Sequence, residues 1–212
     1  MGKTLYLECY SGISGDMTVA ALLDLGADRD VLEKALYSLP IGGFHIEISR
    51  VKKSGLDACD FNVILNHDNH DHDMEYLHGK DHEYSHIHEH SHPHEHRGMR
   101  EITEIIQGSA MTDKAKKMAL HVFDVLAHAE SKAHGVPVEE VHFHEVGAID
   151  SIVDIISVAV CMDNLDITDV IVPVLYEGTG FIRCQHGQIP VPVPAVARIA
   201  EDHHLKLKIT DI

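Results

Sequence analysis

The stretch VHFHEVGAIDSIVDIISVAV, residues 141–160, is the most informative about the fold class because its periodicity changes at one point. The first four residues alternate, which predicts a short strand over residues 141–144 with Phe143 turned into the core. After a Val-Gly turn, apolar residues recur at helical spacing and predict a helix over residues 148–165. A strand that passes through a tight turn into an apolar helix is typical of proteins in which helices cover a sheet.

The rest of the chain continues this alternation of strands and helices. The N-terminus predicts a strand over residues 3–9, a glycine loop and a helix beginning at Asp16. Asp28 or Asp30 is expected to cap a second helix. The remaining elements are expected to be helices ending near residue 39 and over 99–106, 113–134 and 195–202, strands over 44–53, 59–65, 141–144, 170–174, 181–184 and 205–209, and a rigid proline-rich loop over 186–194.

We therefore expect one domain over residues 1–212, of α/β or α+β class, with a mixed sheet and flanking helices. The chain ends soon after a strand-like segment, without a closing helix, which indicates the front part of a longer protein. Apolar periodicity disappears over residues 67–97, and we expect a disordered histidine-rich insertion there.

Composition restricts the partners of this chain. It has 17 basic and 34 acidic residues among 212, a formal net charge of -17, which argues against nucleic acid and anionic membranes as partners. Neither a leader peptide nor a membrane-length apolar run is visible, so we expect a cytoplasmic protein. The four cysteines are scattered, which favours reduced thiols over a disulfide framework.

Histidine is the abnormal component of this sequence. There are 20 histidines, and eleven of them lie between His67 and His96. Imidazole binds nickel, zinc, copper and iron, and a flexible run of it offers many overlapping sites rather than one fixed geometry. Such a segment suits metal capture; the alternative is a solvated acidic linker. Six of these histidines alternate along the chain and are the predicted loading ligands: His86, His88, His90, His92, His94 and His96.

A second, ordered candidate site lies in the opening stretch. His142 and His144 would share one face of the predicted strand, and Glu145 would stand at its end. Asp150 and Asp154 follow at a spacing of four residues and would share a helix face. These groups could form a nitrogen and oxygen metal site; the alternative is a capped helix with solvated acids.

Two further segments carry candidate binding residues. The loop SGISG contains Ser11, Gly12, Ser14 and Gly15, and the free N–H groups of the following helix could hold an anion. No lysine follows the loop, so it is not a P-loop, and Asp16 could be a simple helix cap. His186 precedes the predicted proline-rich loop, which could hold it at the edge of a site.

Three stretches together resemble the LarC family of nickel insertion proteins. They occur in the same order and are LECYSGISGDM at residues 7–17, VHFHEVGAIDSIVD at residues 141–154 and HGQIPVPVP at residues 186–194. The histidine-rich segment also lies where that family carries one. The resemblance covers almost the whole chain, and the second stretch is long and specific.

The resemblance implies a definite reaction. LarC-like proteins use CTP to insert nickel into pyridinium-3,5-bisthiocarboxylic acid mononucleotide, which gives the nickel-pincer nucleotide cofactor of lactate racemase. Nickel becomes bound to a ring carbon and two sulfurs. Full-length members are about twice as long, and their C-terminal part binds CTP with a divalent cation, Mn or Mg. This chain resembles the N-terminal part, so its implied partners are that C-terminal part, the mononucleotide and, downstream, a lactate racemase-type apoenzyme.

The roles of individual residues follow as hypotheses. We expect metal ligation by His142, His144 and the six alternating histidines, substrate phosphate binding by the SGISG loop and His186, and ligation or acid–base chemistry by four carboxylates: Asp16, Glu145, Asp150 and Asp154. Two alternatives remain open. One is a nickel storage or delivery metallochaperone without catalysis of its own, and the other is a metal-dependent phosphohydrolase. A homo-oligomer is also compatible with the sequence.

Overall fold

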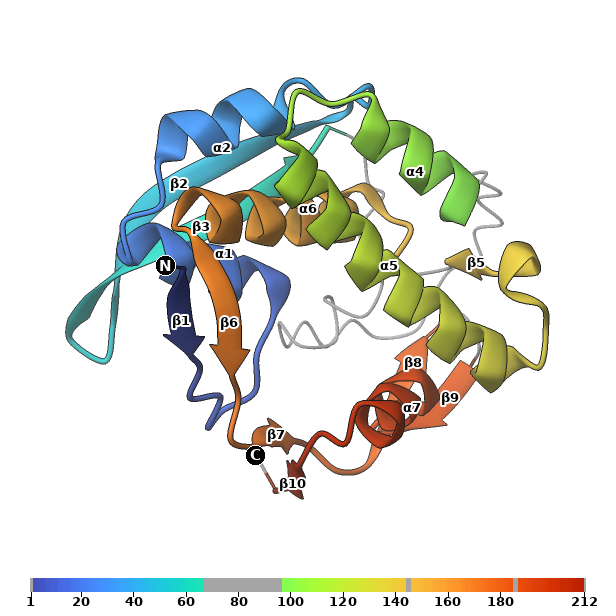
Figure 1. Ribbon diagram of the computed structural model, residues 1–212. Coiled ribbons are helices and arrows are strands. Elements are labelled where there is room, and N and C mark those ends of the chain that lie inside the picture. The colour runs from blue at the N-terminus through green and yellow to red at the C-terminus, as the bar shows by residue number, and fades with distance from the viewer. Residues whose placement is uncertain (1, 67–96, 144–145, 185–186, 212) are drawn as a thin grey trace, which may run out of the picture.

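The computed structural model describes residues 2–66, 97–143, 146–184 and 187–211. Helices and strands interleave along these residues, which confirms the expected α/β class (Figure 1). The helices are α1 (Gly15–Asp24), α2 (Arg29–Leu36), α4 (Met99–Gln107), α5 (Asp113–His134), the 3-10 turn η1 (Val138–Glu140), α6 (Ile149–Asn164) and α7 (Pro194–Asp202). The strands are β1 (Lys3–Tyr6), β2 (Phe44–Lys53), β3 (Leu56–Leu65), β4 (Arg97–Gly98), β5 (His142–Phe143), β6 (Ile167–Ile171), β7 (Leu175–Glu177), β8 (Phe181–Cys184), β9 (Gly187–Pro190) and β10 (Leu207–Ile209).

The strands of the described residues pair two by two rather than in one continuous sheet. The pairs β1–β6 and β7–β10 are parallel, whereas β2–β3, β4–β5 and β8–β9 are antiparallel. An isolated bridge joins Cys9 to Leu175, so the parallel ladder of β1 and β6 continues towards β7. Both strand orientations are therefore present, as expected for a mixed arrangement.

The core is built around α6. Figure 1 shows this helix in the middle of the molecule, with α5 crossing it and α1 and the β2–β3 hairpin beside it. Ile152, Val153 and Ile156 are completely buried on α6, and Phe123 of α5 is buried among them in the same core. Each such side chain contributes about 1.5–3 kcal/mol when it leaves water, so this stripe holds the helices together.

Helix ends follow the capping signals of the sequence. Asp28 caps α2, because its side chain accepts hydrogen bonds from the backbone N–H groups of Asp30 and Val31. Thr112 caps α5 in the same manner, and Gly135 ends that helix in a left-handed conformation. The predicted helix over residues 113–134 is confirmed with the same bounds.

Three local predictions were wrong. The strand expected over residues 170–174 is β6, which begins at Ile167 and ends at Ile171. The segment expected to be a proline-rich loop begins with a strand, because Gly187–Pro190 forms β9 and pairs with β8. Pro190 is tolerated at the end of this strand, since a hairpin has an open edge that does not need its N–H. Strand β3 begins at Leu56, three residues before the predicted start, because Ser54 and Gly55 both adopt positive φ and make a tight two-residue turn.

The described helices include none that is long and apolar enough to cross a membrane. Cys9, Cys59 and Cys161 are free thiols, as the scattered cysteine pattern predicted. Arg97 is the last residue of the stretch assigned to the histidine-rich insertion, and it lies in β4. Residues 67–96 lie outside the described part of the chain.

Candidate functional site

Asp154 is the centre of the candidate site. It lies on α6 and is half-buried, and its Oδ1 atom is buried without a hydrogen-bond partner among the described residues. The N-terminus of α1 packs directly against this carboxylate. A Cβ atom on Gly15 would lie 2.5 Å from Asp154 Oδ2 and 2.7 Å from Asp154 Cβ, so only glycine fits there without a shift. Buried acceptors are normally satisfied, and an unsatisfied one marks a place where a ligand or proton is expected.

Two neighbouring carboxylates raise the pKa of Asp154. Burial, which is the largest cause, and the negative charges of Asp16 and Asp150 together raise its pKa from 3.8 to about 7, although a hydrogen bond from the Asp16 backbone N–H works in the opposite direction. The carboxyl group therefore exchanges its proton close to neutral pH. This is the property that general acid–base catalysis requires of a side chain. We call Asp16, Asp150 and Asp154 the acidic cluster.

Local sequence explains how each member of the cluster is held. Asp150 and Asp154 are one helical turn apart on α6, and Asp150 Oδ1 accepts a hydrogen bond of 2.8 Å from the Ser151 N–H. Asp16 is in the first turn of α1, where the positive end of the helix dipole favours a carboxylate. The N-cap position belongs to Ser14, whose hydroxyl donates to Asp16 instead of capping the helix.

The two glycines of the predicted phosphate loop pack against different elements, Gly12 against β7 and Gly15 against α6. Gly12, with a φ of 85°, packs beside β7, and its N–H donates to the Cys9 carbonyl at 3.2 Å. Gly15 packs against Asp154, so a carboxylate of the chain itself stands at the N-terminus of α1. Ser11 and Ser14 are exposed. Phosphate binding by this loop stays a prediction, and a phosphate here would meet the charge of Asp154.

His142 lies in β5, apart from the helix pair that carries the acidic cluster. Its side chain is exposed and Phe143 is buried, as the alternation predicted. The register pairs Gly98 with His142 and Arg97 with Phe143. The residues that follow the histidine-rich segment therefore lie beside the strand that contains His142. Arg97 Nη1 also donates to the Gly147 carbonyl at 2.8 Å.

Several predicted site residues lie outside the described residues. They are His144, Glu145, His186 and the six alternating histidines, from His86 to His96. Within residues 2–66, 97–143, 146–184 and 187–211, no three His, Cys, Asp or Glu side chains are arranged to hold a metal ion. A complete nickel site would therefore need ligands from the remaining residues or from another molecule, and the ligand assignment stays a prediction.

Sequence reasoning did not identify Arg97 or the contact between Gly15 and Asp154. Arg97 meets Gly147 across fifty residues, and no local pattern signals such a contact. Gly15 could have been suspected, because a glycine in the first turn of a helix is unfavourable unless another group approaches closely.

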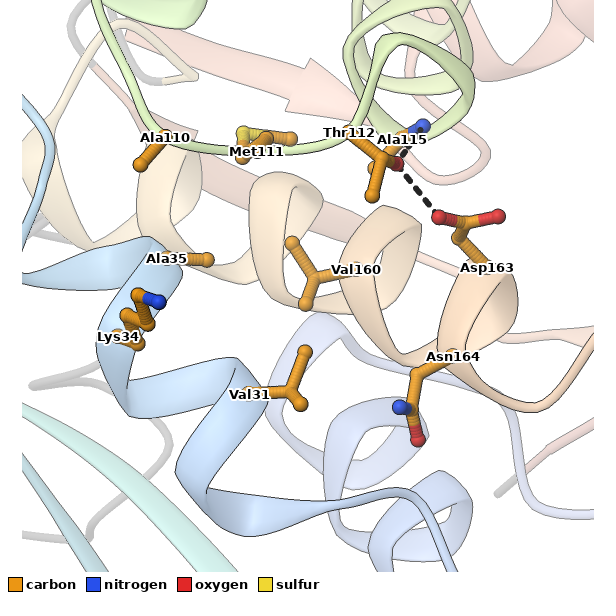
Figure 2. Close-up of a pocket in the computed structure, with 10 residues that line it drawn as sticks. All are labelled: Val31, Lys34, Ala35, Ala110, Met111, Thr112, Ala115, Val160, Asp163 and Asn164. Carbon is orange, nitrogen blue, oxygen red and sulfur yellow. Dashed lines mark hydrogen bonds between the residues drawn. The ribbon is translucent and has the colours of Figure 1, made fainter.

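One pocket lies away from these residues. Figure 2 shows it between α2, the start of α5 and the end of α6, with a volume of about 250 Å³. Its floor is apolar, with Val31 and Val160, and Thr112 donates a hydrogen bond of 2.5 Å to Asp163 at its rim (Figure 2). None of the predicted site residues lines this pocket, so it does not belong to the acidic cluster.

Comparison with known proteins identifies the family. The family described as nickel insertion protein matches residues 5–211, which is nearly the whole chain. The chain belongs to the nickel insertion protein family. No solved structure matches this family member.

Relatives in the nickel insertion protein family carry a more specific name, pyridinium-3,5-bisthiocarboxylic acid mononucleotide nickel insertion protein. The protein of Alkaliphilus metalliredigens is 54% identical over 100% of this chain and 48% of its own length. That of Acetivibrio thermocellus is 37% identical over 99% of this chain and 48% of its own, and that of Clostridium acetobutylicum 44% over 94% and 50%. The chain thus spans about half the length of the curated relatives it matches.

Proposed function

We propose that this chain is the nickel-binding and proton-accepting part of an enzyme that inserts nickel into pyridinium-3,5-bisthiocarboxylic acid mononucleotide. The names of the relatives support this substrate. The sequence resemblance adds that the reaction uses CTP, that a C-terminal part binds this CTP with Mn or Mg, and that the product is the nickel-pincer nucleotide of lactate racemase. The cytoplasm is the proposed location.

The chemistry of the reaction defines what the site must supply. A bond from a pyridinium ring carbon to hydrogen is replaced by a bond from that carbon to nickel, so one proton must leave for a base. A base with a pKa near the working pH combines a large deprotonated fraction with a useful proton affinity. Asp154, with a pKa of about 7, matches this requirement among the described residues.

The buried, unpartnered Oδ1 of Asp154 is the observation that carries the proposal. An acceptor in this position is ready to receive a proton without first losing a hydrogen bond. Asp16 and Asp150 keep its proton affinity high through their negative charges.

The nickel-binding role rests on a different part of the chain. His142 is exposed in β5, and His144 and Glu145 follow directly in the sequence. Because Arg97 pairs with Phe143, the chain leaves the histidine-rich segment beside this motif. We propose that the segment captures nickel and that the motif receives it. A lactate racemase-type apoenzyme would take up the finished cofactor.

The decisive experiment replaces the proposed base by its neutral isostere, Asp154→Asn. The variant is combined with the C-terminal part, CTP, a divalent cation, nickel and the mononucleotide, and the nickel-containing product is followed by mass spectrometry. We expect the insertion rate to fall by about 100-fold or more, in the range that loss of a general base produces. Nickel affinity of the isolated chain should change little, because the ligands are untouched.

Asp124→Asn is the matched control, since Asp124 is an exposed aspartate on α5, outside the acidic cluster. It removes one negative charge from the chain and should insert nickel at the rate of the parent. If Asp154→Asn also inserts nickel at the parental rate, Asp154 is not the base and the proposal for the acidic cluster is wrong.

A further inference from the structure

One face of the parallel strands β1 and β6 is exposed, carries Tyr6 and Ile171 at one end, and has no described element over it. Leu5 and Cys9 point into the core and are buried, whereas the alternate residues Tyr6 and Tyr10 point outward and are 55% and 56% exposed. Tyr6 is the last residue of β1, and Tyr10 follows four residues later, beyond the exposed Glu8. Figure 1 shows β1 and β6 side by side and pointing the same way.

The neighbouring strands extend this face. Ile171 is paired with Tyr6 and is 50% exposed, and the ring of Tyr176 in β7 makes an edge contact with the ring of Tyr10 at 5.4 Å between centroids. We call Tyr6, Tyr10, Ile171 and Tyr176 the tyrosine face. Lys208 lies 4.8 Å from the Tyr176 ring centroid and covers one side of it, so Tyr6 and Ile171 are the open part of the face.

Two general observations mark the tyrosine face as an interface. The chain is poor in aromatic residues, at 5%, yet three of its six tyrosines, Tyr6, Tyr10 and Tyr176, lie here, and tyrosine is enriched where proteins meet. Parallel strands also occur almost only where both faces are covered. Here the core covers one face, and no described residue covers the other.

The length of the relatives indicates what covers it. This chain aligns over nearly all of its own length with only about half of each relative. We propose that the tyrosine face binds the other half of the nickel insertion protein, the part of these relatives that this chain does not match. The inference rests on the proposed function in assuming that this half works together with the chain.

Charge favours that occupant over a second copy of the chain. Glu8 and Asp169 flank the open part of the face and are exposed, and their carboxylates accept hydrogen bonds only from neighbouring hydroxyls within two residues, as far as the described contacts show. Two copies would bring these carboxylates together, in a chain whose formal charge is already -17. The complementary surface is therefore an apolar patch with lysine or arginine at its rim.

Titration calorimetry tests this inference with a defined probe, the polypeptide comprising the half of the Alkaliphilus metalliredigens relative that this chain does not match. The variant is Tyr6→Thr with Ile171→Thr, because threonine preserves strand propensity. Tyr37→Thr is the matched control, since Tyr37 is 58% exposed at the end of α2. We expect the double variant to bind about tenfold more weakly or worse, and the control to bind within about twofold of the parent.

Thermal melting of each variant shows whether the fold is preserved. If the double variant fails to fold, Glu8→Lys takes its place, and it should weaken binding and reduce the dependence of binding on salt. Unchanged binding by these variants, no binding by the parent, or a dimer of the chain that the double variant dissociates would each overturn the inference. Parental binding without nickel insertion by the mixed halves would instead contradict the proposed function and leave the docking surface intact.

Discussion

Replacement of Asp154 by asparagine should stabilise the protein at alkaline pH and not at acidic pH. The folded protein raises the pKa of Asp154 from 3.8 to about 7, so between these values the folded state binds more protons than the unfolded state. Stability is therefore lost as the pH rises through this window, and the full loss is present above the folded-state pKa. Asparagine carries no charge, so the variant does not lose stability in this pH range through burial of a charge at this position.

The expected size follows from the shift. About three pKa units correspond to about 4 kcal/mol when the group is ionised in both states, and only part of this is present at pH 5. The difference in unfolding free energy between Asp154→Asn and the parent should therefore grow by about 2 kcal/mol from pH 5 to pH 8, after allowance for partial exposure of the group.

Urea denaturation at both pH values measures this difference, with the free energy of unfolding extrapolated to water. Groups that titrate alike in parent and variant cancel in the comparison. Asp124→Asn controls for the loss of one carboxylate as such, and its effect should be small at both pH values. A difference for Asp154→Asn that stays constant from pH 5 to pH 8 would show that Asp154 is not destabilised by burial and by the neighbouring charges, and the argument for its role as a base would lose its support.

Three further predictions concern the contacts around this site. Gly15→Ala should cost about 1–3 kcal/mol in urea denaturation, because its methyl group would meet a carboxylate 2.5 Å away, whereas Gly42→Ala, with no atom within 4 Å, should be neutral; equal midpoints would contradict the close packing. Arg97→Ala should cost about 1 kcal/mol and speed hydrogen exchange at the β4–β5 pair, and unchanged exchange would argue against this anchor. In a chain lacking residues 67–96, His142→Ala with His144→Ala should lower the nickel stoichiometry measured by calorimetry; an unchanged stoichiometry and affinity would remove the ordered motif from the list of nickel ligands.

Much of the secondary structure was predictable from short-range patterns. The helix over residues 113–134 agrees with α5 at both ends, because Thr112 and Gly135 supply a cap and a stop that act within one turn. The wrong prediction for residues 186–194 has the opposite origin. Prolines suggested a loop, but the pairing of Gly187–Pro190 with β8 provides hydrogen bonds that override local preference.

Some features of the acidic cluster likewise follow from local sequence pattern, and others follow only from tertiary packing. Helical spacing alone places Asp150 and Asp154 on one face, since residues four apart lie one turn above each other. Asp16 was included among the predicted acid–base residues, but no local pattern shows that it lies beside Asp154 or that Asp154 is desolvated, because both depend on α1 packing against α6 through Gly15. Desolvation and charge repulsion act through space between segments far apart in the chain. Periodicity therefore predicted which carboxylates could act, whereas the packing of α1 on α6 decided which one has a pKa near neutrality.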